Sequence, residues 1–175
     1  MKREDVIQIV KAARDKCEVP DLRRVDLCKA DLSGTDLRQI DLRYANLSAA
    51  NLSGADLEEA DLTGANLRGA NLANARLKNA DLLGVDLTDA KLEGADLLNA
   101  SLRNSALNEA NLGSANLTET TLRGAGLVVA NLRGANLAGA NLIKADLRGA
   151  KVTNEQLSRV KSLKGVVMPD GTIYC

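Results

Sequence analysis

A leucine occupies every fifth position from Leu22 to Leu147, which makes 26 consecutive five-residue units without an insertion or a deletion. The stretch EEADLTGANLRGANLANA, residues 58–75, shows the pattern. An α-helix repeats every 3.6 residues and a strand every 2, so neither element keeps a five-residue stripe on one face. The spacing therefore predicts a stacked repeat architecture, in which each short unit buries its apolar residues against its neighbours.

Each unit has a preferred residue type at four of its five positions. The residue two before the leucine is mostly Ala, the one directly before it is Asp in 11 units and Asn in 9, and the second residue after it is Gly in 10 and Asn in 4. Leucine and alanine would point inward and the intervening Asp or Asn outward, as alternation along a strand requires. Gly or Asn at the last position suits a type II turn, whose third residue needs a positive φ. With about a right angle per turn, four units close a square coil, and its predicted core includes Leu62, Leu67, Leu72 and Leu77.

The A-[DN]-L-x-x run resembles the signature of the pentapeptide-repeat proteins and covers residues 20–151. The resemblance implies an all-β solenoid, namely a right-handed quadrilateral parallel β-helix, and 26 units would give about 6.5 coils of 20 residues. The tail SLKGVVMPDGTIY also resembles endings common among bacterial and cyanobacterial members.

Residues 1–19 and 152–175 flank the repeats and are predicted to cap the two ends of the solenoid, where bare apolar sections and unpaired edges invite aggregation. Helical spacing in residues 3–17 predicts an N-terminal helix that ends before Pro20. Its apolar stripe would comprise Val6, Ile9 or Val10, Ala13 and Cys17. A dimer surface on either end cap is the alternative, so that the expected state is a monomer or a homodimer.

Thr153 and Gln156 have the spacing of a capping box and predict the start of a C-terminal helix. That helix would carry Leu157, Val160 and Leu163 and lie over the last coil. The residues after it, Pro169-Asp170-Gly171, predict a turn before Ile173.

Composition excludes several functional classes. The 23 basic residues equal the 23 acidic ones, so the chain lacks the positive charge typical of nucleic-acid or anionic-lipid binding. The acidic start of the chain and the absence of a long apolar run predict a cytoplasmic protein without a membrane span. Cys17, Cys28 and Cys175 are an odd number and fit a reducing compartment, although a redox pair between Cys17 and Cys28 is the alternative.

Catalytic, metal and cofactor sites are not expected. The chain has no histidine, which removes the commonest general base and the usual zinc and triad arrangements. The carboxylates of Asp56, Glu58 and Glu59 would stand on a flat, solvated face and not in a desolvated pocket. The stretch GAGLVVA begins like a phosphate-binding loop, but Val129 replaces its third glycine.

Dividing the units by four assigns every outward residue to a face. Face 1, which contains Leu22, Leu42, Leu62 and Leu82, stacks four aspartates, Asp21, Asp41, Asp61 and Asp81. Basic residues lie alongside: Arg23, Arg24, Arg43, Arg103, Arg123 and Lys144. Because like charges about 4.8 Å apart repel by roughly 1 kcal/mol or more, the arginines are expected to neutralise the aspartates. The alternative is an arginine stripe that binds an acidic partner.

Face 2 follows face 1 along the chain and contains the predicted partner-binding patch. The Asp/Asn position becomes Ala106 and then Gly126 in successive coils, and Val128 and Val129 follow. Together with Leu83 and Ile143 on face 1, these residues form the least polar surface of the rod, and exposed apolar patches tend to mark interaction sites. Tolerated drift of the repeat is the alternative.

The sequence thus predicts a non-enzymatic rigid scaffold that binds an unknown protein partner through a flat face. Some members of the resembled family imitate duplex DNA and act on DNA gyrase, which gives a first alternative, but residues 21–150 carry only 17 acidic against 14 basic side chains. A polysaccharide-acting β-helical enzyme is a second alternative. It is disfavoured because no inserted loop could wall off a cleft.

Overall fold

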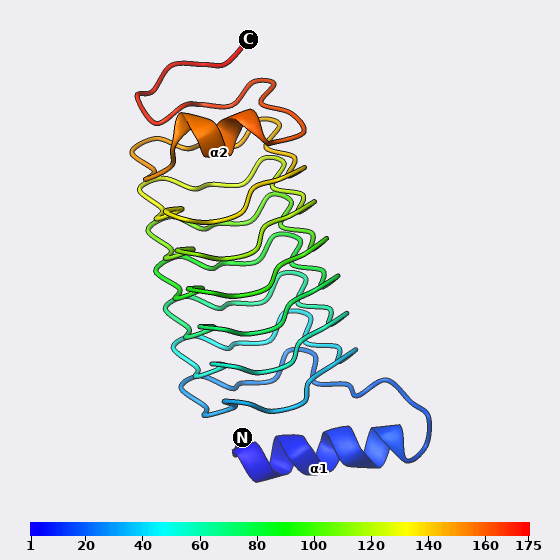
Figure 1. Ribbon diagram of the computed structural model, residues 1–175. Coiled ribbons are helices and arrows are strands. Elements are labelled where there is room, and N and C mark those ends of the chain that lie inside the picture. Colours follow the sequence, from blue (N-terminus) through cyan, green and yellow to red (C-terminus); the bar gives the residue numbers. More distant parts are fainter.

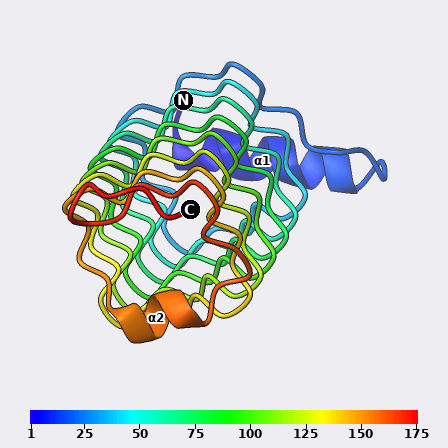
Figure 2. The ribbon, with the colours of Figure 1, turned by 90° about the horizontal axis from the view of Figure 1, so that it is seen from above.

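The computed structural model describes residues 1–175, which form a rod of stacked coils (Figure 1). Parallel single-residue bridges join the residue before each leucine to its counterpart in the next coil, beginning with Asp21 and Asp41. The bridges fall in four columns, so each coil has four sides, as the view along the rod shows (Figure 2). The chain is therefore an all-β solenoid whose sides pair through isolated bridges and not through extended strands.

The interior of the rod consists of leucine and alanine. All 26 leucines from Leu22 to Leu147 are at most 4% exposed, and Leu62, Leu67, Leu72 and Leu77 are fully buried. Where a hydroxyl replaces the inner alanine, it finds a backbone partner: Ser105 Oγ donates to the Leu102 carbonyl at 2.7 Å. Buried polar groups thus cost the rod little, because each is hydrogen-bonded.

The corners repeat as regularly as the core. The second residue after each of the 26 leucines has a positive φ, as the turn pattern predicts, and sixteen of these residues are not glycine. The first such turn is closed by the Val25 N–H, which donates to the Leu22 carbonyl at 3.4 Å. A non-glycine residue with positive φ is uncommon in proteins, so this fold places many side chains in a costly conformation.

Helix α1 (Arg3–Arg14) lies across the first coil (Figure 1). Val6 and Val10 are buried in the same cluster as the leucines, and Ile9 packs against that cluster while partly exposed. The inclusion of Cys17 in the apolar stripe was wrong, because the helix ends at Arg14 and Cys17 is exposed with a φ of 58°.

Helix α2 (Asn154–Ser158) takes the place of one side of a coil, where the column of bridges that reaches Asn136 ends. The predicted capping box is confirmed: the Gln156 N–H donates to Thr153 Oγ1 at 3.2 Å, and the Thr153 N–H donates to Gln156 Oε1 at 2.9 Å. Leu157 is buried and stands 20 residues after Leu137, in the position that a leucine of the repeat would take. Neither α1 nor α2 combines the length and the apolar character that a membrane crossing requires.

The repeat continues beyond α2, which the sequence reading missed. Val160 and Leu163 were expected within the helix, but both lie after its end at Ser158. Bridges Asn141↔Ser162 and Asp146↔Val167 resume the pairing with one extra residue. Leu163 and Met168 then follow the bridging residues, as the leucines do elsewhere, and both pack against the core. The single-residue insertion shifted the five-residue pattern and hid these units.

A β-hairpin ends the chain. Val167 and Ile173 form an antiparallel bridge, and the Met168 N–H donates to the Thr172 carbonyl at 2.7 Å. The predicted turn is confirmed at Pro169–Gly171, since Gly171 has a φ of 86° and its N–H donates to the Met168 carbonyl at 2.9 Å. Gly171 supplies the left-handed residue that three-residue hairpin loops favour. The hairpin gives part of the last coil's exposed edge a hydrogen-bonding partner.

Candidate interaction surface

The predicted patch on face 2 is continuous in space. Ala106 and Gly126 bridge each other in successive coils, and the Glu109 N–H donates to the Val128 carbonyl at 2.9 Å. Ala106, Gly126 and Val128 are partly exposed, and Val129 is 50% exposed. The turn therefore presents Val129 to solvent as the most exposed apolar side chain of the patch.

The two face 1 members of the patch lie apart from each other. Leu83 is 36% exposed and Ile143 is partly exposed. Arg103 and Arg123 occupy the intervening coils at the same position, since the Gly84 N–H donates to the Arg103 carbonyl and the Gly124 N–H to the Ile143 carbonyl. The apolar surface on face 1 is thus interrupted by two arginines.

Asn108 explains how face 2 tolerates the loss of an Asp/Asn side chain at Gly126. Elsewhere that side chain accepts a hydrogen bond from the second residue after it, as Asp81 Oδ1 accepts from the Leu83 N–H at 3.0 Å. Gly126 has no such oxygen, and Asn108 Oδ1 from the preceding coil accepts from the Val128 N–H at 3.0 Å instead. A Cβ on Gly126 would lie 3.1 Å from Asn108 Oδ1, so glycine makes room for this contact. This role of Asn108 is not predicted from the sequence, because the N–H from which it accepts lies 20 residues later in the chain.

The aspartates of face 1 are neutralised in the first coils. Arg23 pairs with Asp21 at 2.7 Å and with Asp41 at 3.5 Å, and Arg43 pairs with Asp41 at 2.6 Å and with Asp61 at 3.4 Å. Hydrogen bonds from Arg23 lower the pKa of Asp21 to about 2, and hydrogen bonds from Arg43 likewise lower the pKa of Asp41. Each arginine bridges the aspartate of its own coil and that of the next.

The expectation that the arginines of face 1 neutralise this column was wrong for Arg24, Arg103 and Arg123, none of which forms an ion pair. Arg24 lies over the Tyr44 ring instead, 5.9 Å from its centroid. Lys144 is unpaired as well. In the coils of Arg103 and Arg123, the aspartate position holds Ser101 and Thr121, which are uncharged.

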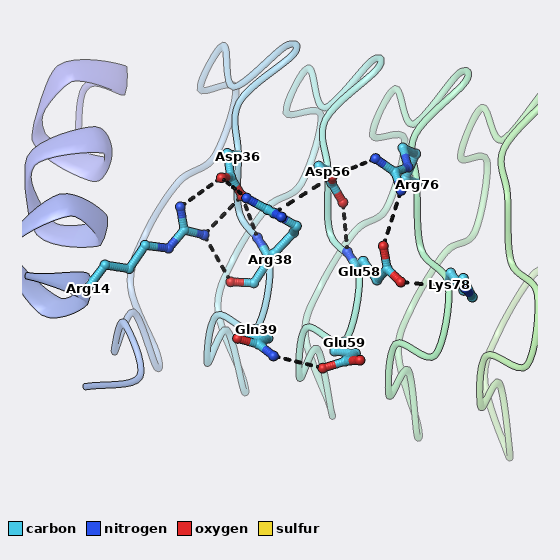
Figure 3. Close-up of polar contacts among 9 residues, drawn as sticks. All are labelled: Arg14, Asp36, Arg38, Gln39, Asp56, Glu58, Glu59, Arg76 and Lys78. Carbon is cyan, nitrogen blue, oxygen red and sulfur yellow. Dashed lines mark hydrogen bonds and ion pairs between the residues drawn. The ribbon is translucent and has the colours of Figure 1, made fainter. Parts of the chain in front are cut away.

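A second ionic cluster joins α1 to another side of the rod (Figure 3). Arg14 donates to both carboxylate oxygens of Asp36 at 2.8 and 2.9 Å and to the Arg38 carbonyl at 3.1 Å. Arg38 pairs with the same Asp36 carboxylate at 2.7 Å. Hydrogen bonds from Arg38 and Arg14 hold the pKa of Asp36 well below its usual range.

The carboxylates that the sequence singled out continue this cluster (Figure 3). Arg76 pairs with Asp56 at 2.9 Å and with Glu58 at 3.2 Å, while Glu59 accepts from Gln39 at 2.8 Å. The hollow beside them is open and lined only by polar side chains. No group of three potential metal ligands lies together in the structure, and all three cysteines are free and exposed.

The sequence matches a known family over most of its length. The family model for pentapeptide repeats (8 copies) matches residues 21–58, 55–94, 86–124 and 117–154. No protein of curated function matches the chain.

Three solved structures illustrate the similarity. HetL from Nostoc sp. strain PCC 7120, involved in heterocyst differentiation regulation, is 31% identical over 99% of this chain and 100% of its own, with a TM-score of 0.30. A thylakoid lumen protein from Arabidopsis thaliana is 27% identical over 81% of this chain and 85% of its own, with a TM-score of 0.26. QnrB1, a plasmid-mediated fluoroquinolone resistance protein, is 22% identical over 83% of this chain and 80% of its own, with a TM-score of 0.45. With its repeats matched from residue 21 to residue 154, the chain belongs to the pentapeptide-repeat family.

Proposed function

We propose that this protein is a non-enzymatic scaffold that binds another protein through the patch of Ala106, Gly126, Val128 and Val129, with Leu83 and Ile143 beside it. The observation that carries the proposal is Val129, a β-branched residue held at a φ of 61° and half exposed. Such a conformation costs of order 1–3 kcal/mol, and strain of this kind clusters at functional sites. Ten other units of the rod place glycine at this position, which would remove the cost.

The ladder of the rod supports a scaffold role. Except where α2 replaces one side, each coil is bonded to the next on four sides, so the outward side chains stand on a backbone that has little freedom to rearrange. A surface that is already ordered loses less entropy on binding, which favours affinity.

A capture experiment tests the patch with two variants. Val128→Asp and Ala106→Asp each put a carboxylate into the proposed contact, where burial without a partner is costly. Immobilised wild-type protein is expected to retain a specific protein from the lysate of its own organism, and each variant to weaken that binding by at least about tenfold, or 1.4 kcal/mol.

Ala138→Asp is the matched control. Ala138 follows the leucine in the same coil as Val128 but stands on the opposite side of the rod and is partly exposed. It should leave binding unchanged, and circular dichroism should show all three variants folded. Unchanged binding by both patch variants would exclude the patch as the binding site. Failure of the wild-type protein to capture any protein would contradict the scaffold function.

The absence of enzymatic activity belongs to the same proposal. Asp56 and Glu58, the carboxylates most crowded in sequence, both pair with Arg76, and the hollow beside them is open and polar, whereas active sites are enclosed clefts. Turnover on a panel of polysaccharides would contradict this part of the proposal.

DNA mimicry directed at gyrase is the alternative function. A mimic needs a row of uncompensated negative charge, whereas Arg23 and Arg43 interleave with the aspartates of face 1. We therefore expect the purified protein to leave gyrase supercoiling unchanged at micromolar concentration. Inhibition in that assay would favour mimicry over the scaffold.

We propose the cytoplasm as the compartment, supported by three exposed free thiols, which persist in reducing surroundings. Cell fractionation followed by immunoblotting tests this assignment.

A further inference from the structure

Face 1 changes its charge along the rod. In the first coils the position before the leucine carries Asp21, Asp41 and Asp61, and Arg23 and Arg43 pair with these aspartates. From the fifth coil onward the same position carries Ser101, Thr121, Asn141 and Ser162, which bridge one another in succession. The carboxylates disappear from this position while the basic side chains remain.

Five exposed cations occupy this end of face 1, and we call them the basic column: Arg103, Arg123, Lys144, Lys161 and Lys164. None of them forms an ion pair or donates a side-chain hydrogen bond within the protein. Residues 101–105, 121–125, 141–145 and 161–166 contain no acidic residue at all. The positive charge of this surface is therefore uncompensated.

The fold stacks these cations in adjacent coils. The Asn104 N–H donates to the Arg123 carbonyl at 2.9 Å, and the Lys144 N–H donates to the Lys164 carbonyl at 3.0 Å. Because neighbouring coils are about 4.8 Å apart, like charges along the column repel one another. A negatively charged partner would relieve this repulsion on binding.

The surroundings of the column favour a protein as that partner. Ile143 lies within the column, and Val128 and Val129 form the turn at the far end of face 2, above Glu109 of the preceding coil. A bound segment that crosses face 2 could therefore place its carboxylates on the column and its apolar side chains on the valines. A single-stranded nucleic acid would offer phosphates but binds through a series of stacking platforms, and the one aromatic residue at this end of the rod is Tyr174, whose carbonyl accepts from the Gly165 N–H.

We infer that the basic column and the neighbouring apolar patch together bind a protein segment that is acidic and carries apolar side chains. The inference rests on the proposed scaffold function and adds the chemistry of the partner. Electrostatic attraction of this kind raises the association rate and weakens with salt.

Fluorescence anisotropy with defined probes tests the inference on the full-length protein. The probes are a labelled 20-residue peptide of Glu, Leu and Ala, its counterpart with Lys in place of Glu, and a 20-nucleotide thymidine strand. We expect the Glu peptide to bind most tightly and its affinity to fall at least about fivefold between 50 and 300 mM NaCl.

Two variants assign the binding to the basic column. Arg103→Glu/Arg123→Glu reverses two unpaired charges and should lower the affinity for the Glu peptide at least about tenfold. Arg133→Glu is the matched control, because Arg133 follows the leucine of the coil that contains Arg123, is exposed and unpaired, but stands on another face. It should change the affinity less than about twofold, the scale of ordinary surface substitutions.

Three results would overturn the inference: tighter binding of the Lys peptide or of the thymidine strand, equal loss in the control variant, or no loss in the double variant. A lysate protein that loses affinity for Val128→Asp but binds Arg103→Glu/Arg123→Glu as tightly as wild type would support the scaffold function and contradict only the inference that the partner is acidic. Binding of the Glu peptide without any captured lysate protein would leave the column's chemistry standing and remove the scaffold.

Discussion

At the scale of single residues, the corner position after each leucine sets the cost of the fold. Asn and Gly tolerate a positive φ, whereas Val129 adopts a φ of 61° with a branched Cβ. The next coil does not crowd this valine, because even a Cβ added at Gly149 would lie 3.4 Å from Val129 Cγ2, at van der Waals distance. The strain is confined to the backbone of Val129, and substitution can relieve it.

We predict that Val129→Gly stabilises the protein by about 1 kcal/mol, because relief of a left-handed valine outweighs the added freedom of glycine in the unfolded chain. Urea denaturation measures the change. Gly54→Val is the reciprocal control: Gly54 has a φ of 63° and open space around its Cα, so a valine there adds strain without a clash and should destabilise by about 1–2 kcal/mol. Equal stability of wild type and Val129→Gly would show that this corner carries no strain.

At the scale of elements, the two helices attach to the coils through specific polar contacts. In α2, Gln156 Nε2 donates to the Leu132 and Ala135 carbonyls at 2.7 and 2.8 Å, while its backbone N–H is bonded to Thr153. In the other coils, the carbonyl at the position of Ala135 accepts a hydrogen bond from a backbone N–H of the next coil. The Thr35 carbonyl, for example, accepts from the Asp56 N–H. The glutamine side chain thus replaces a ladder bond that a helix cannot make.

Gln156→Ala is therefore expected to destabilise the protein by about 1–3 kcal/mol, since it removes half of the capping box and leaves the Ala135 carbonyl without its donor. Thermal denaturation measures the loss. Gln39→Ala removes an exposed side-chain contact to Glu59 and should cost less than about 0.5 kcal/mol. A Gln156 variant as stable as the Gln39 variant would contradict this role.

Arg14 makes the shortest side-chain hydrogen bonds between α1 and the rod. Arg14→Ala removes the hydrogen bonds to Asp36 and Arg38. We predict that it increases amide hydrogen exchange in residues 3–14 at least about fivefold and leaves the central coils protected, because local opening costs least at chain ends. Lys11→Ala serves as the control, since Lys11 lies on the same helix without an ion pair. Exchange that rises equally in both variants, or throughout the rod, would indicate a different attachment.

At the scale of the whole molecule, net charge is zero but the charges are unevenly distributed. Aspartates paired with arginines occupy the coils nearest α1, and Asp146 pairs with Arg148 at 2.6 Å near the other end. The pKa values of Asp21, Asp41 and Asp146 are all lowered, in each case mainly by a side-chain hydrogen bond from arginine. A lowered pKa in the folded state means that folding favours the ionised form.

Stability should consequently be complete above about pH 5, where these carboxyls are ionised in both states, and should fall as pH drops through 4 toward 2, because the unfolded chain then binds protons more readily. We predict a decline of the urea midpoint between pH 4 and pH 2. Asp21→Asn/Asp41→Asn/Asp146→Asn should flatten that decline, because the substituted groups no longer titrate. A midpoint that is independent of pH in the wild type would mean that the arginine bonds contribute nothing to folding.

The sequence alone determined the repeat and most of its consequences. The five-residue spacing of Leu22 to Leu147 allows only a stacked arrangement, and the Gly and Asn positions mark its corners, because both signals depend on local backbone geometry. The capping box at Thr153 and the turn before Ile173 were equally readable, since each involves residues close together in the chain.

The tertiary structure decided what depends on contacts between coils. Leu163 and Met168 belong to the repeat only because a one-residue insertion is absorbed at α2, which no fixed period reveals. Asn108 serves Val128 in the next coil, 20 residues away. Arg103 lacks a carboxylate in its own coil, where Ser101 lies two residues earlier in the chain, and also in the next coil, where the stacking places Thr121. Short-range patterns fix the path of the backbone, whereas pairing between coils decides which side chains remain free to bind.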